Sequence, residues 1–266
     1  MIDSLMAGRR GLIMGVANDH SIAWGIAQQL HRSGAELAFT YQGEAFGRRV
    51  KPLAESVGSD ILLPCDVEEI GTVDAVFEDL KTRWGRIDFV VHAIAFSDKN
   101  ELKGKYADTT RENFIRTMVI SCFSFTEIAK RAAALMPDGG ALVTLTYGGS
   151  VRVMPNYNVM GVAKAALESS VRYLAADYGP QGIRVNAISA GPMRTLAGAG
   201  IGDARAMFSF QHNHAPLRRT ITLEEVGGAG LYLLSPLSGG VTGEIHYVDS
   251  GYNIISMPRP QDLKPD

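Results

Sequence analysis

The segment GLIMGVANDHSIAWGIAQQLHRSG, residues 11–34, carries the pattern that decides the fold. Its first five residues, Gly11–Gly15, are a short apolar run, which predicts a buried strand. A helix-length stretch follows, with Ser21 before it and Gly34 after it. Serine is favoured at the start of a helix and glycine just beyond its end, so a strand, a turn and a helix are expected in immediate succession.

Six further apolar runs follow, each separated from the next by a helix-length segment. The seven strand candidates are Gly11–Gly15, Glu36–Tyr41, Asp60–Cys65, Ile87–His92, Ala141–Tyr147, Ile183–Ser189 and Glu244–Asp249. Such alternation predicts parallel strands with helical crossovers, and near-continuous apolar runs are typical of strands buried on both sides. We therefore predict an α/β fold, a single Rossmann-type doubly wound domain whose seven-stranded parallel sheet is flanked by helices. Thr222 and Glu225 predict a capping box at the start of a later helix.

Composition narrows the class of protein. The chain has 266 residues, 46% of them hydrophobic, which is enough for a sizeable core. Its net charge of -2 argues against nucleic acid or membrane as a partner. No apolar run has the length of about 18 residues that a membrane span needs, and glycines interrupt the N-terminal apolar stretch too early for a signal peptide. We expect a cytoplasmic protein with one domain over residues 1–257 and a flexible tail over 258–266.

The cysteines and the paired histidines do not indicate a metal site. Cys65 and Cys122 lack CxxC spacing and stand in apolar contexts, which predicts two reduced core thiols. His212 and His214 are two positions apart without further ligand candidates, so we expect exposed side chains and no bound metal.

The turn after the first strand is the expected phosphate-binding element. Gly15 permits close approach of a ligand to the backbone, and the helix start at Ser21 and Ile22 offers unpaired N–H groups and a positive dipole end. The spacing is not GxGxxG, however, and an ordinary strand–helix turn explains this segment equally well.

Gln42, after the second strand, stands where a dinucleotide enzyme distinguishes a ribose hydroxyl from a ribose phosphate. Its amide can bind hydroxyl groups, and the nearest following cations are Arg48 and Arg49. This favours NADH over NADPH, unless those arginines fold back towards the site.

The next two strand ends would complete a dinucleotide site. Asp66 can accept a hydrogen bond from an adenine amino group while Val67 packs on the ring, and Ala93 and Ile94 would let a ribose lie close to the backbone. A solvated Asp66 and ordinary packing at the fourth strand end are the alternative interpretations.

Tyr157 and Lys164 stand seven positions apart in PNYNVMGVAKAALE, residues 155–168. On a helix, seven positions are nearly two turns, about 10 Å of axial rise, so both side chains would project from one face with Met160 between them. We therefore expect both to face one pocket. Taken separately, such a tyrosine is ordinarily a packing residue and such a lysine a solvated charge.

With these segments in view, the chain resembles the enoyl-acyl-carrier-protein reductases, a divergent branch of the short-chain dehydrogenase/reductase superfamily. The resemblance runs from about residue 11 to residue 257 through GVANDHSIAWGIA, FTYQ, CDV, TLTYGG, PNYNVMGVAKAALE, YGPQGIRVNAISAGPMRTLA and PLRRTITLEEVG. Ordinary superfamily members space the tyrosine and lysine one helical turn apart, whereas this chain has the wider spacing of the enoyl reductases.

The resemblance implies reduction of trans-2-enoyl-acyl-carrier-protein thioesters with NADH, the last reductive step of bacterial type II fatty acid elongation. Tyr157 would stabilise the enolate oxygen, which lies farther from the attacked carbon than a ketone oxygen does and so fits a tyrosine displaced by about 5 Å. Lys164 would hold the nicotinamide ribose hydroxyls and make the tyrosine more acidic. Tyr147 matches a second family tyrosine, with its role open between substrate orientation and proton supply.

The segment of about residues 191–212 would cover nicotinamide and substrate, and its glycines and alanines predict mobility without ligand. Met193 and Thr195 would contact the cofactor. The substrate residues implied are Phe96, Ser97, Tyr147, Tyr157, Met160, Ala197 and Ile201. Met207 and Phe208 are further candidates for the acyl pocket or, alternatively, helix core.

Ala95 and Ser250 depart from the family pattern, which has glycine at the first position and often at the second. The Ala95 methyl would lie near the nicotinamide ribose and reduce cofactor affinity, as in a secondary enoyl reductase. The resemblance further implies a homotetramer and an acidic acyl carrier protein as partner; the candidate docking residues are Arg194, Arg205, Arg218 and Arg219. Two alternatives stay open, namely another short-chain reductase acting on a ketone or activated alkene, and a dinucleotide-sensing protein without turnover.

Overall fold

The computed structural model describes residues 4–193, 195 and 204–259. Its seven strands form one parallel sheet in the order β3-β2-β1-β4-β5-β6-β7. The strands are Arg10–Met14 (β1), Glu36–Tyr41 (β2), Leu62–Pro64 (β3), Phe89–His92 (β4), Gly140–Thr146 (β5), Ile183–Ala190 (β6) and Ile245–Val248 (β7). The predicted doubly wound sheet is confirmed, and its strand order reverses direction between β1 and β4.

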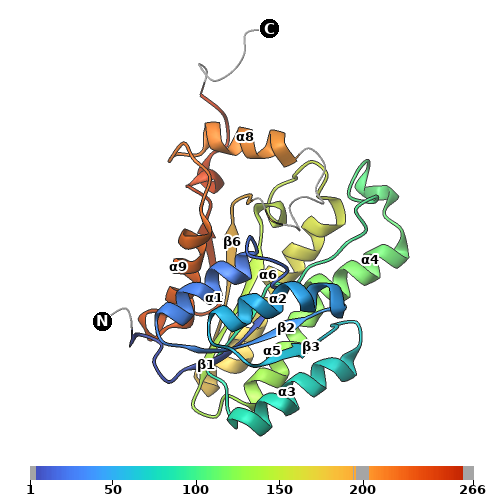
Figure 1. Ribbon diagram of the computed structural model, residues 1–266. Coiled ribbons are helices and arrows are strands. Elements are labelled where there is room, and N and C mark those ends of the chain that lie inside the picture. Colours follow the sequence, from blue (N-terminus) through green and yellow to red (C-terminus); the bar gives the residue numbers. More distant parts are fainter. Residues whose placement is uncertain (1–3, 194, 196–203, 260–266) are drawn as a thin grey trace.

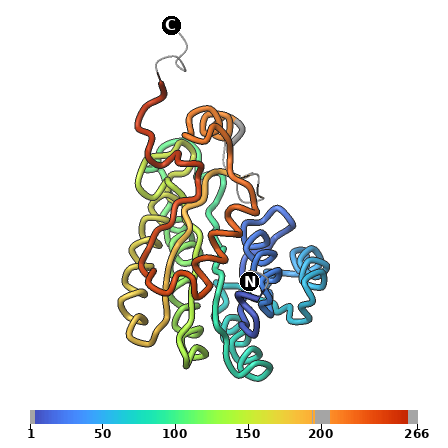
Figure 2. Tube along the Cα trace, turned by 90° about the vertical axis from the view of Figure 1, so that its left-hand side faces the viewer, coloured from blue at the N-terminus to red at the C-terminus, as the bar shows by residue number. Residues whose placement is uncertain are grey.

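Helices cover both faces of this sheet, and Figure 2 shows α1 and α2 on one side with α5 and α6 on the other. The longer helices are Ile22–Arg32 (α1), Gly43–Ser56 (α2), Ile70–Trp84 (α3), Arg111–Met118 (α4), Ser124–Ala134 (α5), Asn158–Tyr178 (α6), Ala204–His214 (α8) and Leu223–Leu234 (α9). Helix α8 lies apart from these layers, above the top edge of the sheet in Figure 1. No helix in the described ranges is long and apolar enough to cross a membrane.

The core has two large apolar clusters, one on each face of the sheet, and a third, small cluster contains Tyr157 and Met160. Successive residues of a strand point to opposite faces, so Leu12 and Met14 of β1 join the cluster under α3, α5 and α6. Ile13, between them, joins the cluster under α1 and α9. This burial on both faces explains why the strands read as continuous apolar runs. Cys65 and Cys122 are free and buried, as expected.

Two predicted helix starts, at Thr222 and at Ser21, have different outcomes. The Thr222 side chain accepts a hydrogen bond from the N–H of Glu225, and the Glu225 side chain accepts one from the N–H of Thr222. The capping box is therefore confirmed. Ser21 does precede α1, but its hydroxyl does not cap that helix. It accepts instead from the N–H groups of Ala17 and Asn18, at 3.0 and 3.1 Å, because the chain curls back ahead of the helix.

Candidate active site

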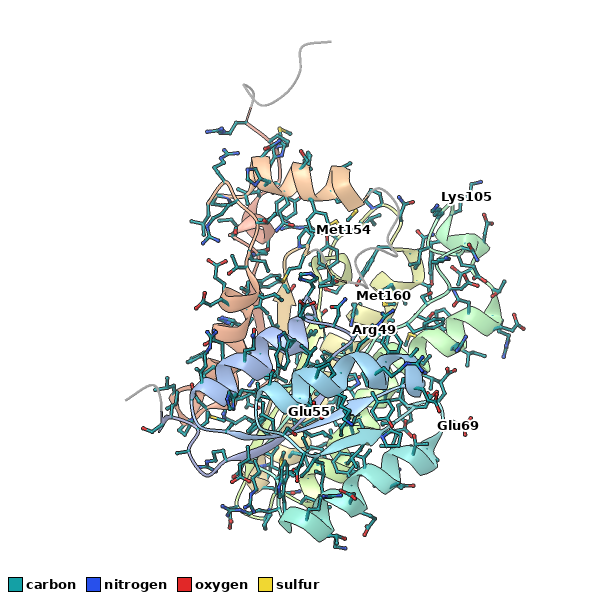
Figure 3. The ribbon with its side chains drawn as sticks, viewed as in Figure 1. Arg49, Glu55, Glu69, Lys105, Met154 and Met160 are labelled. Atoms are coloured by element: carbon teal, nitrogen blue, oxygen red, sulfur yellow. The ribbon has the colours of Figure 1, made fainter. Side chains whose placement is uncertain are left out.

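A cavity of about 620 Å³ opens where the strands end, bounded by the segments after β4, β5 and β6 and by α6 and α8. Carboxyl ends of parallel strands meet at one edge, which is where α/β folds bind ligands. The cavity brings together the predicted residues Ile22, Ala93, Ile94, Phe96, Ser97, Tyr147, Tyr157, Met160, Lys164, Met193 and Thr195. Figure 3 shows Met154 and Met160 in the region between the sheet and α8.

Tyr157 is held in the cavity wall by an unusual local backbone. It immediately precedes α6, so it is not on the helix as predicted, and its neighbours Asn156 and Asn158 both have positive φ, at 58° and 35°. Asparagine tolerates this region better than most residues, and such conformations cluster at functional sites. A Cβ on Gly149 would lie 2.4 Å from the Tyr157 ring, so glycine is required where the ring packs.

Lys164 lies in the same cavity wall, and the expectation that both side chains face one pocket is confirmed. Its side chain is buried, and Nζ donates a 2.8 Å hydrogen bond to the carbonyl of Leu145 at the end of β5. Burial lowers the pKa of Lys164 to about 8, because the charged form loses hydration, while Cys122 and Glu168 raise it in part.

The two tyrosines are weaker acids than expected. Burial raises the pKa of Tyr147 to about 12, with Tyr252 and Asp249 adding to the rise. Burial also raises the pKa of Tyr157 far above its usual range, and Tyr147 and Glu168 raise it further. The prediction that Lys164 makes Tyr157 more acidic is therefore wrong for this structure, because desolvation prevails. Tyr157 is a neutral hydrogen-bond donor.

Gly15 occupies the predicted phosphate turn, although a different contact explains the glycine. Its φ is +93°, and a Cβ there would lie 2.1 Å from the carbonyl oxygen of Ala93. The turn after β1 thus packs directly on the end of β4. Helical geometry leaves the N–H groups of Ile22 and Ala23, the first two of α1, without intrahelical partners, whereas those of Trp24 and Gly25 donate to the carbonyl of Ser21.

Gln42 and Asp66 lie at the ends of the adjacent strands β2 and β3 and contact each other. The Gln42 amide donates a 2.8 Å hydrogen bond to Asp66, which also accepts from the N–H of Glu68. Val67 is buried beside them. These residues share the sheet edge with the cavity but do not line it.

The remaining predictions have mixed outcomes. Met207 and Phe208 line the cavity rather than serving as helix core, and Ala95 lines it as well. Ala197, Ile201, Arg194 and the Arg205 side chain lie outside the described residues, as do residues 196–203 of the expected loop, whereas residues 204–212 of that loop belong to helix α8.

The prediction that His214 is exposed is wrong. The side chain is partly buried, and its ring stacks on Phe210 with centroids 4.0 Å apart. The described residues contain no group of three or more His, Cys, Asp and Glu side chains that could hold a metal ion. Of the basic docking candidates, Arg219 is engaged by Glu225 at 2.5 and 2.8 Å, and Arg218 donates to the carbonyl of Asn213.

Sequence reasoning missed several cavity residues. Leu145, Thr146 and Pro192 belong to the motifs TLTYGG and AGPMRT, so the motifs could have identified them. Lys99 and Leu102 lie in an irregular segment after β4 that carries no motif, and only the fold brings them to the cavity.

A doubly wound parallel sheet, with a tyrosine and a lysine buried together in a cavity at its carboxyl edge, defines the class of short-chain dehydrogenases and reductases. Sequence comparison makes the assignment narrower. The chain belongs to the Enoyl-(Acyl carrier protein) reductase family, whose sequence profile matches residues 15–253.

Individual relatives agree with this assignment. The chain is 76% identical over 263 residues to Enoyl-[acyl-carrier-protein] reductase [NADH] 2 of Rhizobium meliloti (strain 1021), across 99% of the chain and 98% of that relative. The crystal structure of FabI from Candidatus Liberibacter asiaticus has a TM-score of 0.95 and 64% identity, covering 97% of this chain and 100% of that one. The enoyl-(acyl-carrier-protein) reductase of Anaplasma phagocytophilum, solved in complex with NAD, has a TM-score of 0.93 and 56% identity, with coverages of 96% and 97%.

Proposed function

We propose that this chain reduces the carbon–carbon double bond of trans-2-enoyl-acyl-carrier-protein thioesters with NADH, in bacterial type II fatty acid elongation. The observation that carries the proposal is the joint placement of Tyr157 and Lys164 in one buried cavity. The cavity is largely apolar where Leu102, Met160 and Phe208 line it, which suits a fatty acyl chain.

The residues of this chain provide position and electrostatic stabilisation. When bound, NADH supplies the hydride for the β-carbon of the substrate, and a proton from solvent or from the Tyr147 hydroxyl completes the reduction at the α-carbon. Tyr157 donates a hydrogen bond to the thioester carbonyl oxygen, where negative charge develops. Because its hydroxyl is neutral and desolvated, this bond strengthens as that charge grows. Tyr147 orients the Tyr157 ring and the substrate beside it.

The sheet edge fits NADH. The start of α1 after Gly15 offers N–H groups to a pyrophosphate, and Lys164 reaches the part of the cavity where nicotinamide ribose hydroxyls would bind. Gln42 has its carbonyl oxygen available for a ribose hydroxyl, while the neighbouring Asp66 carboxylate would repel a ribose phosphate. This arrangement favours NADH over NADPH. Met193 and Thr195, in the segment after β6, would also contact the cofactor.

The wider assignments rest on the family relationship. The chain would work as a cytoplasmic homotetramer, with residues 1–257 as one reductase domain and a substrate-covering loop at about 191–212. The predicted tail, residues 258–266, lies outside the described residues from residue 260 onward. Its partner would be the acyl carrier protein that delivers the thioester. Arg219 is a weaker docking candidate than expected because Glu225 already neutralises it.

The test follows NADH absorbance with crotonyl thioester and, separately, with acetoacetyl thioester. We expect oxidation with the first substrate only. Activity with the ketone alone would identify another short-chain reductase, and NADH binding without turnover of either substrate would identify a sensing protein.

A further inference from the structure

Glu168 is a buried carboxylate in this region to which no role has yet been assigned. It lies on α6, and only 6% of its surface is exposed. Removing a carboxylate from water costs several kcal/mol unless hydrogen bonds or opposite charge compensate the loss, as an order of magnitude. Its partners should therefore explain why an acidic residue stands there.

The hydrogen bonds of Glu168 hold both ends of one short turn. Thr146, the last residue of β5, donates to the carboxylate at 2.7 Å, and Ser150, the last residue of the following 3-10 turn, donates to the same oxygen at 2.5 Å. Tyr147 lies between these two residues. Anchoring both ends of the turn fixes where the Tyr147 ring lies against Tyr157.

The charge of Glu168 is placed beside Lys164. The two residues are four positions apart on α6 and therefore neighbours on one helix face. Lys164 is buried with a backbone carbonyl as its hydrogen-bond partner. A nearby carboxylate favours the protonated form of a buried amine.

Within the described part of the chain, four further titratable groups interact with this pair, and all four are neutral near pH 7. Burial and the charge of Lys164 lower the pKa of His92, on β4, to about 3. Burial raises the pKa of the Cys122 thiol, which follows α4. The phenols of Tyr157 and of Tyr247, on β7, face Glu168 and also have raised pKa values, mainly through burial.

We propose that Glu168 is a positioning residue of the reductase site, whose carboxylate anchors the turn carrying Tyr147 and keeps Lys164 protonated. This inference rests on the proposed function, because it assigns cofactor binding to Lys164. Glu168 has no direct contact with substrate in this role. Its effect passes through Tyr147 and Lys164.

Glu168→Gln tests the charge, since the amide keeps the size of the side chain and one acceptor oxygen. NADH affinity is measured by fluorescence titration at pH 6 and pH 8. Loss of the Glu168 charge lowers the pKa of Lys164 further, which leaves affinity near the wild-type value at pH 6 and weakens it severalfold at pH 8. Asp177→Asn, exposed on the same helix, is the matched control and should bind NADH as the wild type does at both pH values.

Ser150→Ala and Thr146→Val test the anchoring separately, because each removes one hydroxyl and keeps the carboxylate. We expect each to lower kcat with crotonyl thioester severalfold while the ratio of NADH affinities at pH 6 and pH 8 stays at the wild-type value. These two variants also decide the question of anchoring if Glu168→Gln does not fold, as judged by circular dichroism.

Two results would overturn the inference. One is a folded Glu168→Gln protein whose NADH affinity has the wild-type pH dependence, and the other is wild-type kcat in both hydroxyl variants. Failure of the proposed function has a different signature, namely a wild-type protein that binds NADH but does not reduce the enoyl thioester.

Discussion

The rings of Tyr147 and Tyr157 meet edge to face, with centroids 5.2 Å apart and planes inclined at 75°. This geometry is worth about 0.5–1.5 kcal/mol beyond area burial and restrains both rings. Tyr147 thus orients Tyr157 through its ring, whatever its hydroxyl does.

Tyr147→Phe keeps the edge-to-face contact, whereas Tyr147→Ala removes it. We expect the alanine variant to lose about tenfold more kcat than the phenylalanine variant, in line with the value of the ring contact. Steady-state rates with crotonyl thioester measure the difference. Equal losses in the two variants would show that the hydroxyl carries the function, as a proton supplier would.

Lys164→Met should weaken NADH binding about 10- to 100-fold, because hydrogen bonds from a charged donor are lost. The folded-state pKa of Lys164 is about 8, below its ordinary 10.5, so the cation is present below pH 8 and lost as pH rises through that value. Wild-type NADH affinity should therefore fall above pH 8, and the variant should lack this dependence. Isothermal titration across pH 6–9 measures both effects, and a pH-independent wild type would contradict this role.

His92 should make the protein sensitive to acid. It is fully buried between Thr144 and Ser124, at 3.1 and 2.9 Å, and burial lowers its pKa from 6.5 to about 3. The unfolded chain therefore binds the proton more readily, and the stability that the neutral ring contributes above pH 6.5 is lost as pH falls towards 3. Between pH 7 and pH 5 the loss is about 2 kcal/mol.

Urea denaturation of His92→Gln measures this contribution. The difference in unfolding free energy between pH 7 and pH 5 should be about 2 kcal/mol smaller in the variant than in the wild type. An unchanged difference would mean that other groups cause the acid sensitivity.

Ser250→Gly should stabilise the fold. Ser250 has a φ of 59°, in the left-handed region, and its buried Oγ is without a hydrogen-bond partner among the described residues. Glycine removes both the backbone strain and the unpaired hydroxyl, and we expect the free energy of unfolding to rise by about 1 kcal/mol. Thermal unfolding measures the gain, with Ser56→Gly, in an exposed helix end, as a control that should destabilise. A loss of stability in Ser250→Gly would contradict the strain argument.

The sheet could be predicted from the sequence because its strands are buried on both faces, so apolar runs such as Phe89–His92 stand out from the helices between them. Helix starts were predictable where side chains follow local rules, as at Thr222, but not at Ser21, whose hydroxyl turns back to Ala17.

In the candidate site, too, some features follow from the sequence pattern and others depend on the fold. The spacing of Tyr157 and Lys164 predicted a shared cavity, although the helix begins only after the tyrosine. The raised pKa of Tyr157 depends on burial and on groups distant in sequence, and no motif reports it. The contribution of Lys99 likewise depends on how an irregular segment folds over the sheet edge.

The most direct test of the account compares Tyr157→Phe with the wild type under saturating NADH and crotonyl thioester. Removing one hydrogen-bond donor from the developing oxyanion should lower kcat about 100-fold or more, while NADH affinity stays within about twofold. Tyr173→Phe, exposed on the same helix, should keep wild-type kcat. Wild-type kcat in Tyr157→Phe would contradict the assignment of the Tyr157 hydroxyl to the reaction.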